Sequence, residues 1–278
     1  MGKPPGVTAS AIVAISLYVP LFSCASPEKG AIDSSSVSSP AIATPARPEP
    51  KPESKPAGSL EIYIDSVVPA NPLVVSGRAR TFENTVQVRA RDAEGNIVAA
   101  EHVMSVGEMG HHNPYTAELW ITRDPGPRLT VEAFEYSAKD GSVRSLTSKV
   151  VPYGVERMRL TLYLPVGNDC IQTRAFARVV PKSVGMARLL VEAVIAGPDG
   201  AEKAAGAVAP FPPGSDVNSV VLRDGALTVD FNERLRNVGG SCAATAIRHS
   251  VTRTLSQLPT VKRVIITAGG SDKLALQP

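Results

Sequence analysis

The side chains that could coordinate a metal ion gather in one short stretch, "GEMGHHNPY", which holds the adjacent histidines His111 and His112. A zinc site needs further ligands, so His102 or Glu108 would have to join this pair. The spacing fits no zinc-binding pattern, and adjacent side chains of an extended chain point to opposite faces. We therefore interpret the stretch as a polar surface loop and predict no metal site.

Two carboxylates, Asp224 and Asp230, are spaced closely enough to suggest acid–base chemistry. Asp224 already has a role in an Asp-Gly turn, and Asp230 lies beside the apolar face of a predicted strand, where solvent or a cap would satisfy it. The chain has no nucleophile elbow, zincin helix, phosphate loop or dinucleotide fingerprint. We predict no catalytic residues and no cofactor, so the protein is not expected to be an enzyme.

A third kind of chemistry is suggested at Cys24, where an apolar run ends. The run from Val7 to Phe22 follows Lys3, is interrupted by Pro20 and is too short to cross a bilayer. It suits the centre of a signal peptide, predicted over residues 1–23. The ending "LFSC" resembles the lipobox of bacterial lipoproteins, which implies that Cys24 is lipidated and becomes the first residue of the mature chain. The alternative is an ordinary cleaved signal with an incidental cysteine.

Residues 24–59 are predicted to form the lipidated cysteine and a disordered tether. The segment is rich in Pro, Ser and Ala, as in "PARPEPKPESKP", and buries too little apolar area to offset its ordering entropy. A flexible chain of this length reaches about 30 Å on average. We therefore expect the folded part to work outside the cytosol, lipid-anchored to a cell membrane but held clear of its headgroups.

Two cysteines, Cys170 and Cys242, are left once Cys24 serves as the anchor. In an oxidising compartment such a pair is typical of one disulfide. Two alternatives stay open: Cys242 as a reactive thiol at a helix N-terminus, or two inert buried thiols. His249 is a poor base for Cys242, because seven residues of helix place it about 10.5 Å along the axis.

The charge of the chain excludes one class of partner. Its formal net charge is +3, its isoelectric point is near 8.8, and its Lys and Arg residues are scattered. A nucleic-acid-binding protein concentrates basic residues in a patch or stripe. We therefore predict no nucleic-acid partner.

Residues 60–152 show alternating apolar runs with turns between them. "TVQVRA" and "IVAAEHV" flank the turn "RDAEGN", and "LTVEAFEYS" and "VRSLTSKV" flank the Asp-Gly turn of "AKDG". "YTAELWIT" places Tyr115, Ala117, Leu119 and Ile121 on one face. About seven short strands without helical periodicity predict an all-β antiparallel sandwich. The Cys…Trp…Cys framework of antibody domains is missing, so only the architecture is implied.

Residues 158–270 follow the short connection "VPYGVER" and mix strands with helices. "SVGMARLLVEAVIAGP" predicts a helix with Ser183 as its N-cap and a stop at Gly197, and "SCAATAIRHSVTRTLSQLP" predicts a second helix with Ser241 as its N-cap. "SVVLRDGALTVDF" predicts a hairpin, with Leu222, Leu227, Val229 and Phe231 facing inward. The expected fold is α+β, an antiparallel sheet with both helices on one face, followed by a C-terminal tail over residues 271–278.

Both parts carry a resemblance. Arg178, "LLVEAVIAGP", "FPPGSDVNSVVLRDGALTVDF" and "VTRTLSQLPTVKRVIITAGG" resemble a GerMN domain, the module of a spore-germination lipoprotein. "LVVSGRARTFENTVQVRARDAEGNIV" and "LTVEAFEYSAKDGS" resemble the immunoglobulin-like GerM-associated domain. The resemblance implies an extracytoplasmic bacterial lipoprotein associated with sporulation or germination. A single GerMN copy, where the germination lipoprotein has two, argues against a ring-forming role.

Two functions from different classes follow. The first is a non-catalytic envelope lipoprotein, anchored to the membrane, whose domains bind an envelope protein partner or peptidoglycan. The second is a regulatory lipoprotein that senses a small ligand between its domains and modulates a membrane sensor kinase. The third hypothesis is a hydrolase of wall material.

Overall fold

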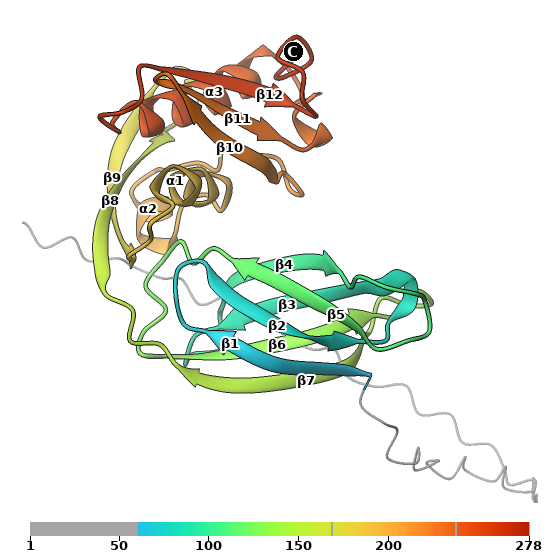
Figure 1. The fold of residues 1–278 in the computed structure, drawn as a ribbon. Helices are drawn as coiled ribbons and strands as arrows, with labels where there is room; N and C mark the ends of the chain where they lie inside the picture. Colours follow the sequence, from blue (N-terminus) through green and yellow to red (C-terminus); the bar gives the residue numbers. More distant parts are fainter. Residues whose placement is uncertain (1–60, 168, 237, 278) are drawn as a thin grey trace, which may run out of the picture. The chain divides into compact units, whose positions relative to one another are not determined.

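The computed structural model describes residues 61–167, 169–236 and 238–277, and by their contacts these residues belong to one compact unit (Figure 1). The predicted signal peptide, Cys24 and the tether lie outside the described residues. Two separate apolar cores are present, one built from Ile62 to Tyr153 and the other from Leu160 to Leu276. Within the described ranges, no helix has the length and apolar character needed to cross a membrane.

The first core lies between two antiparallel sheets. One sheet has the strand order β1-β2-β5 and the other β4-β3-β6-β7. Alternate residues point inward, as Tyr115, Ala117 and Leu119 of β5 show by their burial. The seven strands of the predicted sandwich are therefore present: β1 (Ile62–Val68), β2 (Leu73–Ala79), β3 (Thr85–Arg91), β4 (Ile97–Met104), β5 (Asn113–Leu119), β6 (Arg128–Tyr136) and β7 (Val143–Pro152).

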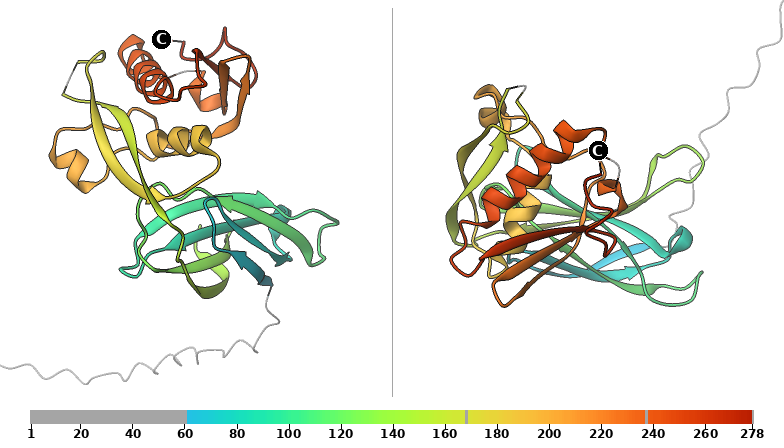
Figure 2. Two further views of the ribbon diagram at one scale, coloured as in Figure 1. Left: turned by 60° about the vertical axis from the view of Figure 1, so that its left-hand side comes forward. Right: turned by 90° about the horizontal axis from the view of Figure 1, so that it is seen from above.

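The second part contains two small sheets with helices between them. Helices α1 and α3 pack against each other between the two sheets, so the prediction of one sheet is wrong (Figure 2). Both helices contact β8, and α1 also contacts β10 while α3 contacts β9 and β12. The β8–β9 hairpin is one sheet and β10-β11-β12 is the other. The elements are β8 (Arg157–Pro165), β9 (Thr173–Pro181), α1 (Met186–Ile195), α2 (Gly200–Ala204), β10 (Val217–Arg223), β11 (Ala226–Phe231), α3 (Ser241–Leu255) and β12 (Arg263–Ala268).

The prediction of a purely antiparallel sheet is wrong for β12, which pairs parallel to β11, from Ala226 beside Arg263 to Phe231 beside Ala268. The connection between these strands contains α3, and a helical crossover returns the chain to the same end of the sheet. The segment after β12, expected as a tail, also contributes to the core. Ala275 and Leu276 are buried, and the Leu276 N–H donates to the carbonyl of Leu235 at 2.8 Å.

Glycines, and not the predicted serines, occupy the N-cap positions of α1 and α3. The N-cap positions of α1 and α3 are Gly185 and Gly240, neither with a side-chain cap, so the predicted caps Ser183 and Ser241 are each displaced. Ser183 instead accepts a hydrogen bond from the Gly185 N–H at 3.1 Å. The predicted stop at Gly197 is confirmed, because this residue follows α1 with φ of +72°.

The β10–β11 hairpin turns at Asp224 and Gly225, whose φ angles of 52° and 81° are those of a type I′ turn, as the Asp-Gly pair predicts. Leu227, Val229 and Phe231 are buried as expected. Leu222 faces the same side as its cross-strand partner Leu227, yet it is 44% exposed, so its predicted burial is wrong. The reason is its place on β10, an edge strand with nothing beyond it to cover the side chain.

Candidate functional site

The sandwich and the second part meet through a buried asparagine. Asn71, in the loop between β1 and β2, donates through Nδ2 to the carbonyls of Ile121 at 3.1 Å and Pro181 at 2.9 Å. Its Oδ1 accepts from the Ile121 N–H at 3.0 Å. Every polar group of this carboxamide is used, and Pro181 belongs to β9, so a single side chain joins the two parts.

A buried ion pair supports the same junction. Arg178 of β9 donates through Nε to Glu202 Oε1 at 3.1 Å and through Nη2 to Glu202 Oε2, while both side chains are less than a tenth exposed. The same guanidinium reaches the carbonyls of Gly197 at 2.9 Å and Thr122 at 3.4 Å. Glu202 also closes the capping box that starts α2 at Asp199. One arginine therefore connects β9, α2 and the loop after β5.

The single tryptophan lies at this junction as well. Trp120 packs against the core of the second part, and the Arg188 guanidinium stands 5.9 Å from its ring centroid. A Cβ on Gly185 would lie 2.7 Å from Trp120 Cη2, so only glycine fits at this position before α1.

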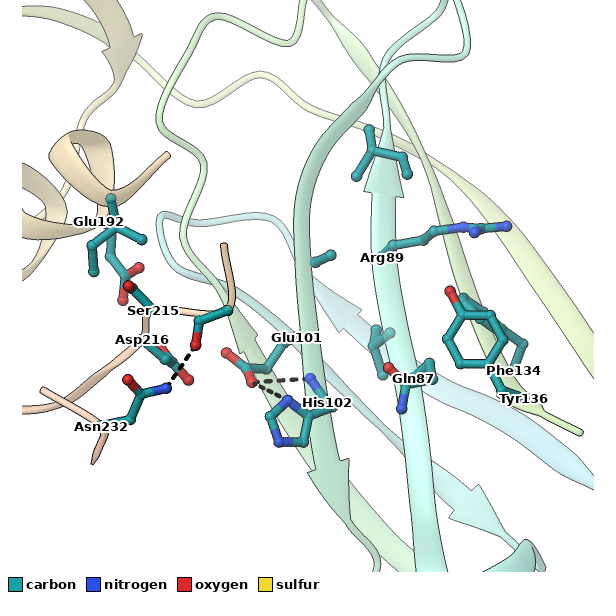
Figure 3. Close-up of a pocket in the computed structure, with 15 residues that line it drawn as sticks. Gln87, Arg89, Glu101, His102, Phe134, Tyr136, Glu192, Ser215, Asp216 and Asn232 are labelled. Carbon is teal, nitrogen blue, oxygen red and sulfur yellow. Dashed lines mark hydrogen bonds and ion pairs between the residues drawn. The ribbon is translucent and has the colours of Figure 1, made fainter. Parts of the chain in front are cut away.

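Beside the junction lies a hollow of about 410 Å³ with an acidic wall (Figure 3). Figure 3 shows Glu101 on β4 and Glu192 on α1 directed toward Asp216, which precedes β10. Arg188 is the cation of the group, because its Nε lies 2.7 Å from Glu192 Oε1. The same guanidinium also acts electrostatically on Glu101.

This crowding of negative charge changes the acidity of the wall. Burial raises the pKa of Glu192 to about 7, Arg188 offsets part of the rise, and Asp216 and Glu101 add to it. Burial also raises the pKa of Glu101, and Asp216 adds to that effect. Near neutral pH, Glu192 is therefore held as a mixture of the protonated and ionised forms.

The hollow also contains an unpaired acceptor. Asn232 donates through Nδ2 to the Gly214 carbonyl at 2.8 Å, whereas its buried Oδ1 has no hydrogen-bond partner within the described part of the chain. Carboxylates and a free amide oxygen are acceptors, so the hollow suits a ligand rich in N–H donors. The sequence did not predict this site, because its residues come from segments that are far apart in the chain. They lie on β4, on α1 and around Asp216 and Asn232.

The structure places the predicted site residues elsewhere. Cys170 and Cys242 form a disulfide with a Cα–Cα distance of 5.1 Å, which links the β8–β9 loop to the start of α3. His111 and His112 are exposed in the β4–β5 loop. Among the described residues no group of three or more His, Cys, Asp or Glu is arranged to hold a metal ion.

The two aspartates of the β10–β11 hairpin have separate structural roles. Asp224 forms the turn, and Asp230 accepts hydrogen bonds from Thr267 Oγ1 at 2.6 Å and the Gly270 N–H at 2.8 Å. Partial burial works to raise the pKa of Asp230, but the hydrogen bonds from Thr267, Asn218 and Gly270 hold it below its usual value. The side chain thus ties β11 to the end of β12.

A second candidate site is the outer edge of β9. The Tyr163 N–H of β8 donates to Thr254 Oγ1 at 3.0 Å, and the Thr161 carbonyl accepts from Gln257 Nε2 at 2.8 Å, so α3 covers the free edge of β8. These backbone groups point away from β9. Their cross-strand partners Ala175 and Ala177 must therefore point their own N–H and C=O groups away from β8.

That outer edge of β9 is open. Among the described residues no second strand pairs with β9, and no turn, loop or side-chain hydrogen bond involves the outward N–H and C=O groups of Ala175, Ala177 or Val179. All three side chains are exposed. Natural edge strands are usually protected by Lys, Pro or a bulge, and none interrupts these three positions. The edge is therefore suited to accept an added strand.

Comparison with known proteins assigns both parts. Residues 51–142 match the family of the immunoglobulin-like domain of bacterial spore germination, and residues 161–274 match the sporulation and spore germination family. The chain is a GerMN-type protein with an immunoglobulin-like spore-germination domain. The β-sandwich is thus the immunoglobulin-like domain, and β8 to β12 belong to the GerMN domain.

Solved structures include similar GerMN domains. The tandem GerMN domains of the sporulation protein GerM from Bacillus subtilis are 24% identical, with a TM-score of 0.35, over 42% of this chain and 40% of that one. The first GerMN domain of the same protein is 24% identical, with a TM-score of 0.34, over 41% of this chain and 84% of that one. A putative lipoprotein from Clostridium perfringens is 16% identical, with a TM-score of 0.27, over 41% and 76%. No curated protein matches the chain.

Proposed function

We propose that this GerMN-type protein is a non-catalytic adaptor of the bacterial envelope, lipid-anchored at Cys24, which captures an extended segment of an envelope protein along β9. The sporulation and germination families of its two domains support an envelope setting, and they have no known catalytic role. The "LFSC" ending of the apolar N-terminal run supports the anchor.

The open edge of β9 is the observation that carries the proposal. A segment that adds to this edge would gain backbone hydrogen bonds at Ala175, Ala177 and Val179, and its alternate side chains would lie beside small residues. The strand is also fixed to the rest of the protein, because Arg178 donates to Glu202 and the Pro181 carbonyl accepts from Asn71. A preorganised edge loses little entropy on binding.

The test is photo-crosslinking of the full chain in its own bacterium, with a photoreactive residue at position 175. We expect a discrete adduct with an envelope protein in the native background, and its loss in the Ala177→Pro variant. Proline removes the N–H that the partner would use, while the β8–β9 ladder keeps all its bonds because the Ala177 N–H faces away from β8. The matched control is Ala177→Val, which keeps the N–H and should keep the adduct.

Other outcomes would contradict parts of the proposal. An adduct that persists in Ala177→Pro would show that the edge does not hold the partner. An adduct that disappears on muramidase digestion would identify peptidoglycan instead of a protein. If mass spectrometry finds no acyl chain on Cys24, the lipid anchor is refuted.

The acidic hollow favours a second candidate function, a sensor of a small cationic ligand that regulates a membrane kinase. The three carboxylates and the unpaired Asn232 Oδ1 support this alternative. Because the pKa of Glu192 is near 7, a polyamine should bind more strongly above neutral pH, where this carboxylate is ionised.

Calorimetric titration of the full chain with spermidine tests the alternative. We expect Glu192→Gln to weaken binding about tenfold, as expected for one lost partly buried charge contact. The exposed Glu156→Gln is the control and should bind like the unmodified chain. If all three proteins bind spermidine with equal affinity, the hollow is not the binding site for the cationic ligand.

A further inference from the structure

Four large apolar side chains are exposed at one end of the immunoglobulin-like domain. Phe82, Met104, Val106 and Met109 are between 65% and 77% exposed, and we call these four residues the apolar tip. The cross-strand register brings them to one end: Met104 lies opposite Thr85, just after Phe82, and Val106 and Met109 belong to the loop that follows Met104. Single exposed apolar residues are common on protein surfaces, but a group of four on neighbouring loops marks an interaction site.

The loop that carries Val106 and Met109 is held by buried polar groups. Asn84 Nδ2 donates to the Gly107 carbonyl at 3.0 Å, and Asn113 Nδ2 donates to the Glu108 carbonyl at 2.6 Å. The Val106 N–H donates to the Pro114 carbonyl at 2.9 Å.

Gly107 adds a steric constraint to these hydrogen bonds. A Cβ on Gly107 would lie 2.2 Å from Asn113 Oδ1, so the backbone and Asn113 fit together only because this residue is glycine. The loop therefore presents Val106 and Met109 in a fixed arrangement. A fixed apolar surface loses little entropy on binding, which favours docking.

The chain enters the domain at this same end. Arg80, two residues before Phe82, donates its N–H to the Glu61 carbonyl at 2.7 Å, and Glu61 is the first described residue (Figure 1). The junction with the GerMN domain, built on Asn71 and Ile121, is at the opposite ends of β2 and β5. The folded part therefore begins beside the apolar tip and away from the GerMN domain.

We propose that the folded part, instead of being held clear of the headgroups as the tether alone predicts, inserts its apolar tip into the surface of the lipid bilayer to which the tether leads. The GerMN domain is then directed away from the membrane. This rests on the lipid anchor of the proposed function, because the anchor makes the bilayer the surface nearest to the end of the tether. Glu83 and Glu108 flank the tip and are exposed. The insertion is therefore apolar, and anionic lipid should not strengthen it.

The test uses the full chain with a fluorophore on a new cysteine at Glu108→Cys, beside Met109, and vesicles of phosphatidylcholine with nitroxide-labelled lipid. We expect a blue-shifted emission and quenching by the nitroxide, both for the acylated chain and, at high lipid concentration, for the Cys24→Ala chain. A fluorophore at Lys203→Cys, on α2 of the GerMN domain, should not be quenched.

Matched double variants test the side chains themselves. Val106→Asp with Met109→Asp should lower the vesicle partition of the Cys24→Ala chain at least about tenfold, since two large apolar side chains would no longer enter the lipid. Val221→Asp with Leu222→Asp, which are exposed on β10, should leave it unchanged. Absence of quenching at position 108 would overturn the proposal. Mass spectrometry of Cys24 reports on acylation separately, so an unlipidated Cys24 would refute the anchor while the Cys24→Ala vesicle assay still decides the tip.

Discussion

At the scale of single residues, Arg178 shows how much of this structure depends on one buried charge. The guanidinium is 5% exposed and contacts the Glu202 carboxylate together with the carbonyls of Gly197 and Thr122. A buried ion pair is weak evidence for stability in itself, because desolvation opposes the Coulomb attraction. Removing one partner is a different matter, since it leaves the other charge buried without compensation.

We therefore predict that Arg178→Met lowers the free energy of unfolding by about 3–5 kcal/mol. The double variant Arg178→Met with Glu202→Gln should recover part of this loss, because a neutral Gln side chain can still accept the Asp199 N–H that starts α2. Urea unfolding of the three proteins measures the difference. A double variant less stable than Arg178→Met would show that Glu202 stabilises the fold without its arginine.

At the scale of elements, the sequence allowed the local features to be predicted. Alternating apolar residues predicted the face of β5, the Asp-Gly pair predicted the turn at Asp224 and Gly225, and Gly197 predicted the end of α1. Each of these depends on interactions between residues close in the chain, where side-chain periodicity and φ preferences decide the outcome.

The features that could not be predicted depend on residues distant in sequence. The parallel pairing of β12 follows from where α3 packs, and the position of α1 and α3 between two sheets follows from which strands share a core. Ser183 and Ser241 are not the N-caps of these helices, because contacts with distant residues decide where the helices begin. The α3 start carries Cys242, whose disulfide to Cys170 anchors it to the β8–β9 loop.

The candidate sites also depend on residues that are distant in sequence. The acidic hollow combines Glu101, Glu192 and Asp216 from three separate segments, so only the folded chain brings these carboxylates together. The open edge of β9 could not be predicted either, because it depends on α3 covering β8 and leaving Ala175 and Ala177 uncovered.

At the scale of the whole molecule, the acidic wall and the junction are coupled. Glu192 lies one helical turn after Arg188, whose guanidinium packs over Trp120 at the junction. The charges that act on Glu192 come from its own helix and from facing elements: Arg188 on α1, Glu101 on β4 and Asp216 before β10. Ionisation of Glu192 therefore adds a negative charge beside Glu101 and Asp216, where the immunoglobulin-like and GerMN domains meet.

The sign of the pH effect follows from the pKa of Glu192, which burial raises from 4.5 to about 7 in the folded chain. Between these two values the folded state keeps a proton that the unfolded state has released, so stability falls as the pH rises through this window. The side chain is 16% exposed, and the loss is up to about 3 kcal/mol. Carboxylates whose pKa is lowered in the folded chain, such as Asp230, have the opposite effect: they make the protein more stable as the pH rises, at pH values below this window.

We predict that urea unfolding followed by Trp120 fluorescence has a lower midpoint at about pH 8 than at about pH 5, and that Glu192→Gln removes most of this difference by stabilising the protein at the higher pH. The substituted carboxamide would still accept a hydrogen bond from Arg188 but would add no charge to Glu101 and Asp216. Glu156→Gln removes an exposed carboxylate far less constrained by burial, so its pH dependence should match that of the unmodified chain. If Glu192→Gln loses stability with rising pH as steeply as the unmodified protein, then the acidic wall does not control the junction, and the titrating group must be sought elsewhere in the molecule.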